Sequence, residues 1–476
     1  MGFTNKIFTF NPSTRAVKYV HFLFCLWLLT LPFGSNLFHL SLGFLTIYPN
    51  LLLTLVLFPF ALSTIKKFNR FEFLFICFLF LWTIFEMIFA NSIGMSTEVL
   101  FDIRSLLIQF LLATTIVGVY KFIGQQAFLN TLIIGLRCFL FILMFSGIIE
   151  FMTGIHFAGY KTTELLDLPV GNIFYAPMFI HENPNDYLTY LIFVFLLLNL
   201  FDQKFSANYL LKSLIALIIF VFSIYADSNI AKLISEGILL VFTVQIVKPH
   251  LKKETLKVKI IPYFAVTIFL FITVFTNPLF FGPKYKDGPN YRLNGLSVIV
   301  EKNKQLSVLT AKESLAKSEQ KKVMDYLDSI NTQNPKGSAN LRKNLILNGI
   351  DFIKSAPIIG IGPGGFARKI KHNEHKYYVH THTSPHNFPI ELISQFGIFG
   401  WLYLTFLILV VAKLLQLWRK MNSNQKVALG ILLASMPLLW MMPSAFLYLN
   451  IHCLFLPLLL ILLDTMKDKP HLDGIK

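Results

Sequence analysis

The sequence predicts an all-α polytopic integral membrane protein with about 12 transmembrane helices and one large extracytoplasmic loop between helices 9 and 10. Composition is the first reason. Of the 476 residues, 55% are hydrophobic and 14% are charged, whereas soluble proteins carry about 25% charged residues. The mean hydropathy is +0.62. These values exclude an ordinary soluble globular protein.

Apolar runs of spanning length are the second reason. Runs such as 71–90 approach the ~20 residues that an α-helix needs to cross a ~30 Å hydrocarbon core. The first run lacks a small-residue cleavage site, so we expect it to stay as a membrane anchor. Helices are expected at 17–33, 41–63, 71–90, 100–120, 127–151, 185–201, 208–226, 229–247, 259–277, 389–416, 426–442 and 445–464.

Charge placement is the third reason. The chain has 42 basic and 25 acidic residues, a net charge of +17, and many of the basic residues flank apolar runs. The short basic connections at 66–70, 248–259 and 419–426 fall on one side of the expected topology, which is cytoplasmic by the positive-inside rule. This distribution favours a membrane partner and argues against nucleic acid.

The expected topology divides the chain into three parts. Residues 1–281 contain helices 1–9, residues 282–388 form an extracytoplasmic loop domain, and residues 389–476 contain helices 10–12 and a cytoplasmic tail. Within the loop, 300–330 has the spacing of an amphipathic surface helix and 341–354 has a second helical pattern. Candidate residues for chemistry gather in this loop domain.

His386 is the candidate general base. Ser384 and Pro385 are predicted to open the tenth helix as N-cap and first residue, with His386 in the first turn. The helix dipole would disfavour the imidazolium there, and a neutral imidazole can take a proton from a hydroxyl. The alternative is an interfacial histidine that only caps or packs, and position alone does not separate the two.

Arg342 is the candidate anion-binding residue. It precedes a helical pattern in the basic outer loop, where it could meet an anionic lipid headgroup. A guanidinium fork matches phosphate oxygens at two points, which lysine cannot do. Arg292 and Arg368 are weaker candidates of the same kind, and the alternative for each is a solvated surface charge.

No metal and no nucleotide cofactor are predicted. A metal site is the alternative that five histidines before helix ten raise: His372, His375, His380, His382 and His386. His380 and His382 alternate as on an extended strand, and Glu374 is the only close carboxylate. The glycine-rich turn at 360–365 lacks the Gly-Lys-Ser/Thr of a nucleotide cradle, so we interpret it as a bend beside the site.

Other polar residues lie at helix ends or within apolar runs. Asn183-Pro184-Asn185-Asp186 is predicted to begin helix six with Asp186 in its first turn, and the alternative is an ordinary cap. Ionisable groups at membrane depth are functional candidates, and some are expected to form internal ion pairs. They are Asp102, Arg104, Arg137, Asp227 and Lys232.

Four landmarks give the chain a family resemblance. They are 179–186, Asn340-Leu341-Arg342 with the stretch to Pro357, the turn 359–366, and Pro385-His386-Asn387 followed by Glu391-Leu392 and Gly397-Ile398-Phe399-Gly400. In this order they resemble the O-antigen ligase and polysaccharide polymerase superfamily of bacterial membrane glycosyltransferases, teichuronic-acid-type members included. The detailed resemblance spans about 340–403.

The resemblance implies a site between the outer loop and the bundle, on the extracytoplasmic face of the bacterial plasma membrane. It implies that His386 activates the acceptor hydroxyl and that Arg342 binds the donor diphosphate. Arg292 is expected as a second diphosphate-binding residue, and Asn387, Asp186 and Asn185 are expected to support the site. One departure concerns Asp227-Ser228-Asn229, where many members carry Ser-Arg. If that arginine holds phosphate in the relatives, then either Lys232, Arg104 or Arg292 replaces it here or the donor is held differently.

The function expected from the resemblance is that of an O-antigen ligase-like glycosyltransferase in cell-surface polysaccharide biosynthesis. It would transfer a glycan from undecaprenyl diphosphate to an acceptor hydroxyl without metal. A repeat-unit polymerase differs only in its acceptor, which is a second lipid-linked repeat. A lipid-linked glycan flippase or exporter is the alternative of another class, although the two related halves and interrupted helices common in transporters are not evident.

Overall fold

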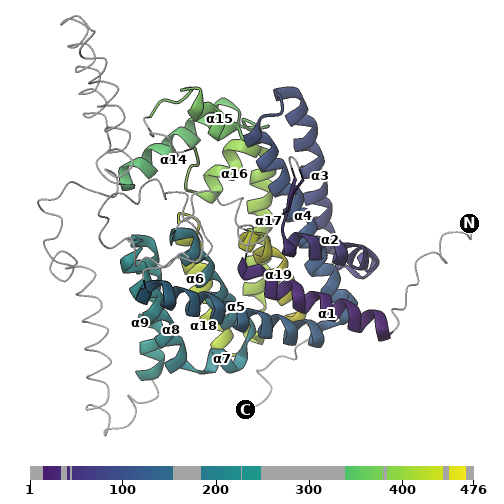
Figure 1. The fold of residues 1–476 in the computed structure, drawn as a ribbon, viewed down its shortest axis with the longest axis vertical. Helices are drawn as coiled ribbons and strands as arrows, with labels where there is room; N and C mark the ends of the chain where they lie inside the picture. The colour runs from purple at the N-terminus through teal and green to yellow at the C-terminus, as the bar shows by residue number, and fades with distance from the viewer. Residues whose placement is uncertain are drawn as a thin grey trace, which may run out of the picture.

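The structure is a computed structural model that describes residues 14–33, 40–42, 45–153, 179, 184–226, 228–247, 338–377, 379, 383–442 and 450–467. Within these ranges the protein is almost wholly helical, which confirms the all-α class (Figure 1). The exception is a small antiparallel hairpin of β1 (Leu40–Leu42) and β2 (Leu45–Ile47), with Leu40 opposite Ile47. The expected span 259–277 and the expected amphipathic segment 300–330 lie outside the described residues.

Several of the described helices follow one another with short connections. Short 3-10 turns at Leu31–Phe33, Ile65–Lys67 and Trp418–Lys420 adjoin them. The α-helices are α1 (Thr14–Thr30), α2 (Pro49–Leu62), α3 (Arg70–Ile93), α4 (Thr97–Ile123), α5 (Gln125–Thr153), α6 (Pro184–Phe201), α7 (Gln203–Ala207), α8 (Tyr209–Tyr225), α9 (Asn229–Val247), α14 (Ser338–Ser355), α15 (Gly365–Lys371), α16 (Phe388–Phe396), α17 (Ile398–Gln416), α18 (Ser423–Leu439) and α19 (Asn450–Lys467).

Four of the described helices are long and apolar enough to cross a membrane, namely α3, α4, α5 and α17. The helices α2, α6 and α8 are apolar but shorter. Many large apolar side chains on these helices are exposed, Ile88, Phe141 and Ile408 among them, as expected for surfaces that face lipid. The protein is therefore a membrane protein, and the count of about 12 spans stays a prediction.

Two expected helix boundaries were wrong. The run 41–63 was expected to be one helix, but the hairpin occupies its start and α2 begins at Pro49, a residue suited to the first helical turn. The run 389–416 was also expected to be one helix. It is divided at Gly397, whose φ of 52° and ψ of −119° lie outside the helical region, so α16 ends there and α17 begins.

Most helices share one large apolar core, and α4 packs against α1, α2, α3, α5 and α19. A second, smaller core joins α14, α15 and the segment after them. It contains Leu341, Leu345, Phe352, Ile361, Phe366, Ile370 and Val379. Figure 1 shows α14, α15 and α16 together at one end of the molecule, beside one end of α3 and α4. The part of the chain that carries the candidate residues thus has its own packing.

The opposite ends of α3, α4 and α19 meet in a buried polar network. Asn69 caps α3 in a capping box with Glu72 and donates to Asp464 of α19. Lys121 at the end of α4 pairs with Asp464 at 2.7 Å and with the fully buried Glu72 at 3.1 Å. Breaking such a pair would strand a buried charge, so the network fixes these three ends together.

Arg137, a candidate at membrane depth, forms an internal ion pair. Its guanidinium contacts the Asp202 carboxylate at 2.5 Å, and Asp202 also caps α7 by accepting from Lys204 and Phe205 N–H groups. The expectation that some of these residues pair internally is confirmed here. Arg137 therefore has a structural partner that accounts for its place in an apolar helix.

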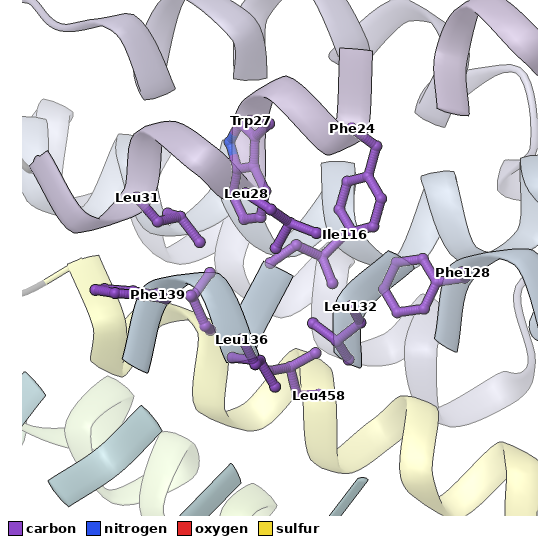
Figure 2. Close-up of a pocket in the computed structure, with 11 residues that line it drawn as sticks. Phe24, Trp27, Leu28, Leu31, Ile116, Phe128, Leu132, Leu136, Phe139 and Leu458 are labelled. Atoms are coloured by element: carbon purple, nitrogen blue, oxygen red, sulfur yellow. The ribbon is translucent and has the colours of Figure 1, made fainter. Parts of the chain in front are cut away.

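A wholly apolar pocket lies between α1, α4, α5 and α19 (Figure 2). The polar side-chain group among its lining residues, the Trp27 Nε1–H, donates to Thr54 Oγ1 at 2.8 Å, so the wall presents apolar surface, and apolar voids of this kind stay dry. It lies among the core helices and none of the candidate residues lines it. The lining residues are Phe24, Trp27, Leu28, Leu31, Ile116, Phe128, Leu132, Leu136, Phe139, Leu454 and Leu458.

Candidate functional site

Arg342 lies in the first turns of α14, which confirms the helical pattern expected at 341–354. Its side chain is partly buried, and burial lowers the pKa of the guanidinium from its ordinary value. Arginine stays charged in proteins even so. Within the described residues no carboxylate pairs with Arg342. A charged, partly desolvated guanidinium without a carboxylate is suited to an anionic ligand.

α14 packs directly on α16. Gly349 faces this contact, and a Cβ at that position would lie 2.2 Å from Cγ2 of Ile390. Only glycine allows the two helices to come this close without one side chain moving. The helix of Arg342 and the helix that follows His386 are therefore in contact.

Asn348 is a residue that the sequence analysis missed. It is fully buried on α14, and its amide oxygen accepts from the N–H groups of Lys376 (3.2 Å) and Tyr377 (2.9 Å), while its amide nitrogen donates to the Tyr377 carbonyl (2.7 Å). These three bonds fix the segment that leads toward His386. The sequence does indicate that Asn348 is buried, because it falls in the apolar spacing of Leu341, Leu345 and Phe352.

The glycine-rich turn lies against the end of α16. The N–H of Ile361 donates to the Ser394 carbonyl and that of Gly362 to the Gln395 carbonyl, both at 2.9 Å. These carbonyls belong to the last turn of α16 and have no partner within that helix. The turn thus supplies the donors that the helix end requires, and its place beside the site stays a prediction.

The same turn is fixed to α4. Gly364 caps α15 with a φ of 65°, and its N–H donates to Asp102 Oδ2 at 2.7 Å. A Cβ on Gly364 would lie 2.6 Å from backbone atoms of Glu98 and Val99. Lys371 at the far end of α15 pairs with Glu98. α15 is therefore fixed to the first turns of α4 mainly through Gly364 and Asp102, while the more exposed pair of Lys371 and Glu98 lies at its far end.

The structure corrects the expected place of His386. α16 begins at Phe388, and its N-cap is Asn387, whose side chain accepts from the Ile390 N–H at 3.2 Å. Ser384 is not the cap, because Asn387 with Pro389 in the first turn makes a better helix start. His386 thus precedes the helix, so the argument from the helix dipole was wrong in its premise.

His386 has an unusual backbone conformation. Its φ is 49°, and its side chain is partly exposed. Non-glycine residues rarely adopt positive φ, and such conformations are often held in place at functional sites. Asn387, predicted as a supporting residue, shapes this geometry by starting α16 directly after the histidine.

The start of α16 is also fixed to the membrane helices. The Phe388 N–H donates to the Trp440 carbonyl at 3.1 Å, and the Phe388 ring packs on Trp440 and Tyr403. These contacts bring α17 and α18 against the residue that lies two positions after His386. The loop that carries His386 is therefore held from both sides.

Asn185 and Asp186 lie in the first turn of α6, as predicted. Thr189 donates to the Asn185 carbonyl at 2.7 Å, and α6 packs against α5 and α18. Arg292 and Asp227 lie outside the described residues. Of the proposed substitutes for the missing arginine, Arg104 lies over the Tyr48 and Phe101 rings, and Lys232 is buried in the first turn of α9.

The histidine cluster does not form a metal site among the described residues, which contain no group of three His, Cys, Asp or Glu able to hold an ion. Two of the five histidines, His380 and His382, are outside that part. Glu374 pairs with Lys369 at 3.0 Å, and this hydrogen bond lowers the pKa of the Glu374 carboxyl. Metal independence stays a prediction.

Comparison with known proteins agrees with the motifs. The family model of O-antigen ligase matches residues 188–405, which include Arg342, the glycine-rich turn, His386 and Asn387. Asn185 and Asp186 lie just before the matched range. No curated protein matches the chain. The family match confirms the resemblance indicated by the sequence and supports the O-antigen ligase superfamily for this chain.

Proposed function

We propose that the protein is an O-antigen ligase-like glycosyltransferase of the bacterial plasma membrane, with its site on the extracytoplasmic face. The main support is the arrangement around α16: the helix of Arg342 packs on it, the glycine-rich turn bonds its end, and His386 directly precedes it. A reacting hydroxyl and an anionic leaving group need such a base and such a cation near each other.

In the proposed reaction, His386 takes the proton of an acceptor hydroxyl as its oxygen attacks the anomeric carbon of the donor sugar. The bond between that carbon and the diphosphate oxygen breaks, and undecaprenyl diphosphate leaves with the bonding electrons. Arg342, together with Arg292, stabilises the charge on the diphosphate through its fork of N–H donors. Asn387, Asn185 and Asp186 support the site, and metal has no part.

A polymerase that uses the same chemistry would differ only in the acceptor, a second lipid-linked repeat. An exporter would instead move the donor across the bilayer without forming a glycosidic bond. Support for an enzyme comes from the family match and from the contact between α14, which carries Arg342, and α16, which follows His386. Membrane lipids and a lipid-linked donor are the proposed partners, together with a glycan acceptor.

The test uses the purified full chain in liposomes with a lipid-linked oligosaccharide and a choice of acceptors. We expect a new glycosidic bond and release of undecaprenyl diphosphate, without ATP and in the presence of chelator. Elongation of the lipid-linked glycan itself would identify the polymerase. Movement of intact donor across the bilayer with no new bond would support the exporter and overturn the proposal.

A further inference from the structure

The turn after α14 exposes an apolar tip, Pro357–Ile359. Ile358 is 71% exposed and Ile359 is 46% exposed. Single exposed apolar residues are common and need no explanation. This tip differs because the residues that contact its backbone belong to a helix that is long and apolar enough to cross a membrane.

Backbone contacts fix the tip at the start of α17. The Ile398 N–H donates to the Ile358 carbonyl at 2.7 Å. Between them, Gly397 leaves no room for a side chain, since a Cβ there would lie 2.2 Å from the Ile358 carbonyl oxygen. Ile358 therefore lies at the level where α17 begins.

The surface next to the tip is apolar from the first turn of α17. Ile398, Trp401 and Leu402 are all exposed. Trp401 stands near the helix end, where tryptophan is enriched in membrane proteins because its amphipathic ring suits the headgroup level. The tip continues this surface, and no described part of the chain covers it.

The neighbouring helix α3 extends the same surface. Its Phe85 ring packs on Phe399 of α17 at 4.9 Å, and Ile88, one turn further on, is 69% exposed. Lys354, near the end of α14, is exposed three residues before Pro357. A lysine in this place can keep its ammonium among lipid phosphates while its stem lies along apolar surface.

We infer that Pro357–Ile359 is a membrane-interface anchor that enters the boundary between lipid headgroups and acyl chains. The occupant is the bilayer itself, because the tip is continuous with the exposed faces of α3 and α17. Gly360 and Gly362 follow at once, and Gly362 bonds the end of α16. The depth of the anchor then sets the height of α16 above the lipid phosphates. If the proposed function holds, the donor diphosphate lies at the level of these phosphates.

The test measures the depth of three labelled positions in liposomes of phosphatidylethanolamine and phosphatidylglycerol. Ile358→Cys carries an environment-sensitive fluorophore in a full-length background in which Cys25, Cys77, Cys138 and Cys453 are alanine. Ile88→Cys is the reference for lipid and His372→Cys, an exposed position beyond α15, is the reference for water. Each variant is first shown to melt and elute like the parent.

We expect the label at Ile358 to emit at shorter wavelength than the label at His372, to be quenched by spin-labelled lipid and to resist iodide. Quenching by iodide equal to that at His372 would overturn the anchor. Protection from iodide that disappears when the protein is diluted in lipid would also overturn it, because a second copy would then be covering the tip. The measurement needs no glycan, so its result is independent of whether transfer is found.

Discussion

Asp102 of α4 accepts a 2.7 Å hydrogen bond from the backbone N–H of Gly364, a residue 262 positions later in the chain. This bond connects a membrane helix to the glycine-rich turn, which in turn bonds the last carbonyls of α16. His386 directly precedes Asn387, the N-cap of α16. A membrane helix, a turn and the candidate base thus form one connected unit, so a substitution at Asp102 should alter the position of His386.

The first prediction concerns this bond. Asp102→Ala leaves the Gly364 N–H without its acceptor, and an unsatisfied buried donor costs about 1–3 kcal/mol. We expect a lower melting temperature and a fall in kcat larger than the change in KM. Asp102→Asn keeps an oxygen acceptor of similar size and should retain most activity. An equal loss in both variants would show that the charge, rather than the bond, is required.

Glu98→Gln is the matched control for Asp102. Glu98 lies one turn earlier on α4, and its replacement by glutamine weakens the pair with Lys371, whose side chain is exposed. Exposed ion pairs contribute only about 0–1 kcal/mol. We expect melting temperature and transfer to stay close to the parent.

The second prediction concerns Gly364. An alanine there would have to adopt a φ of 65°, and its Cβ would lie 2.6 Å from the backbone of α4. The conformation alone costs about 1–2 kcal/mol for a residue with a Cβ, and the contact adds to this. Gly364→Ala should therefore lower both thermal stability and transfer. Gly237→Ala is the control, since a Cβ there meets nothing within 4 Å and alanine favours a helix by about 1 kcal/mol.

The third prediction concerns Asn348. Asn348→Leu would remove the acceptor of the Lys376 and Tyr377 N–H groups and the donor to the Tyr377 carbonyl. Each group left unsatisfied costs about 1–3 kcal/mol, so the segment should detach from α14. Hydrogen exchange at Tyr377 should accelerate, and transfer should fall. Ser355→Ala, on the exposed end of the same helix, should change neither, and unchanged exchange in Asn348→Leu would contradict the assignment.

Local patterns predicted the helices better than they predicted the contacts between distant segments. Apolar runs and charge placement located α3, α4, α5 and α6 closely, because spanning helices need long apolar stretches. The division at Gly397 was missed, since it depends on Ile358, a residue distant in the sequence. The hairpin before α2 was missed because its residues are apolar and continue the run.

The sequence predicted which residues belong to the candidate site, and the structure corrected where the helix beside them begins. His386 and Asn387 were chosen from a helix-start motif, but two adjacent starts compete there, and the start after Asn387 is the one formed. The partners of Asp102 and Asn348 could not be predicted, since their hydrogen bonds join segments far apart in sequence. Asp102 was a candidate because it lies in an apolar run, whereas Asn348 was missed, and neither pattern identifies a partner.

The last prediction separates the roles of His386 and Arg342. His386→Ala removes the proposed base, and general-base assistance is typically worth about 10²–10⁴-fold in rate. Donor affinity should survive, because the histidine acts on the acceptor. Arg342→Lys keeps a positive charge but loses the two-point fork, so donor affinity and transfer should both fall. Arg342→Ala should lower the donor affinity further than Arg342→Lys does.

The measurements are donor affinity and single-turnover transfer for each variant, after each has been shown to insert and melt like the parent. Lys343→Ala is the matched control for Arg342, since Lys343 is the next residue of α14 and its side chain is exposed. It should leave donor affinity close to that of the parent. Near-normal transfer by His386→Ala would remove the general-base assignment. Unchanged donor affinity in both Arg342 variants would make that arginine a surface charge, because loss of the fork cannot be silent if the fork holds the diphosphate.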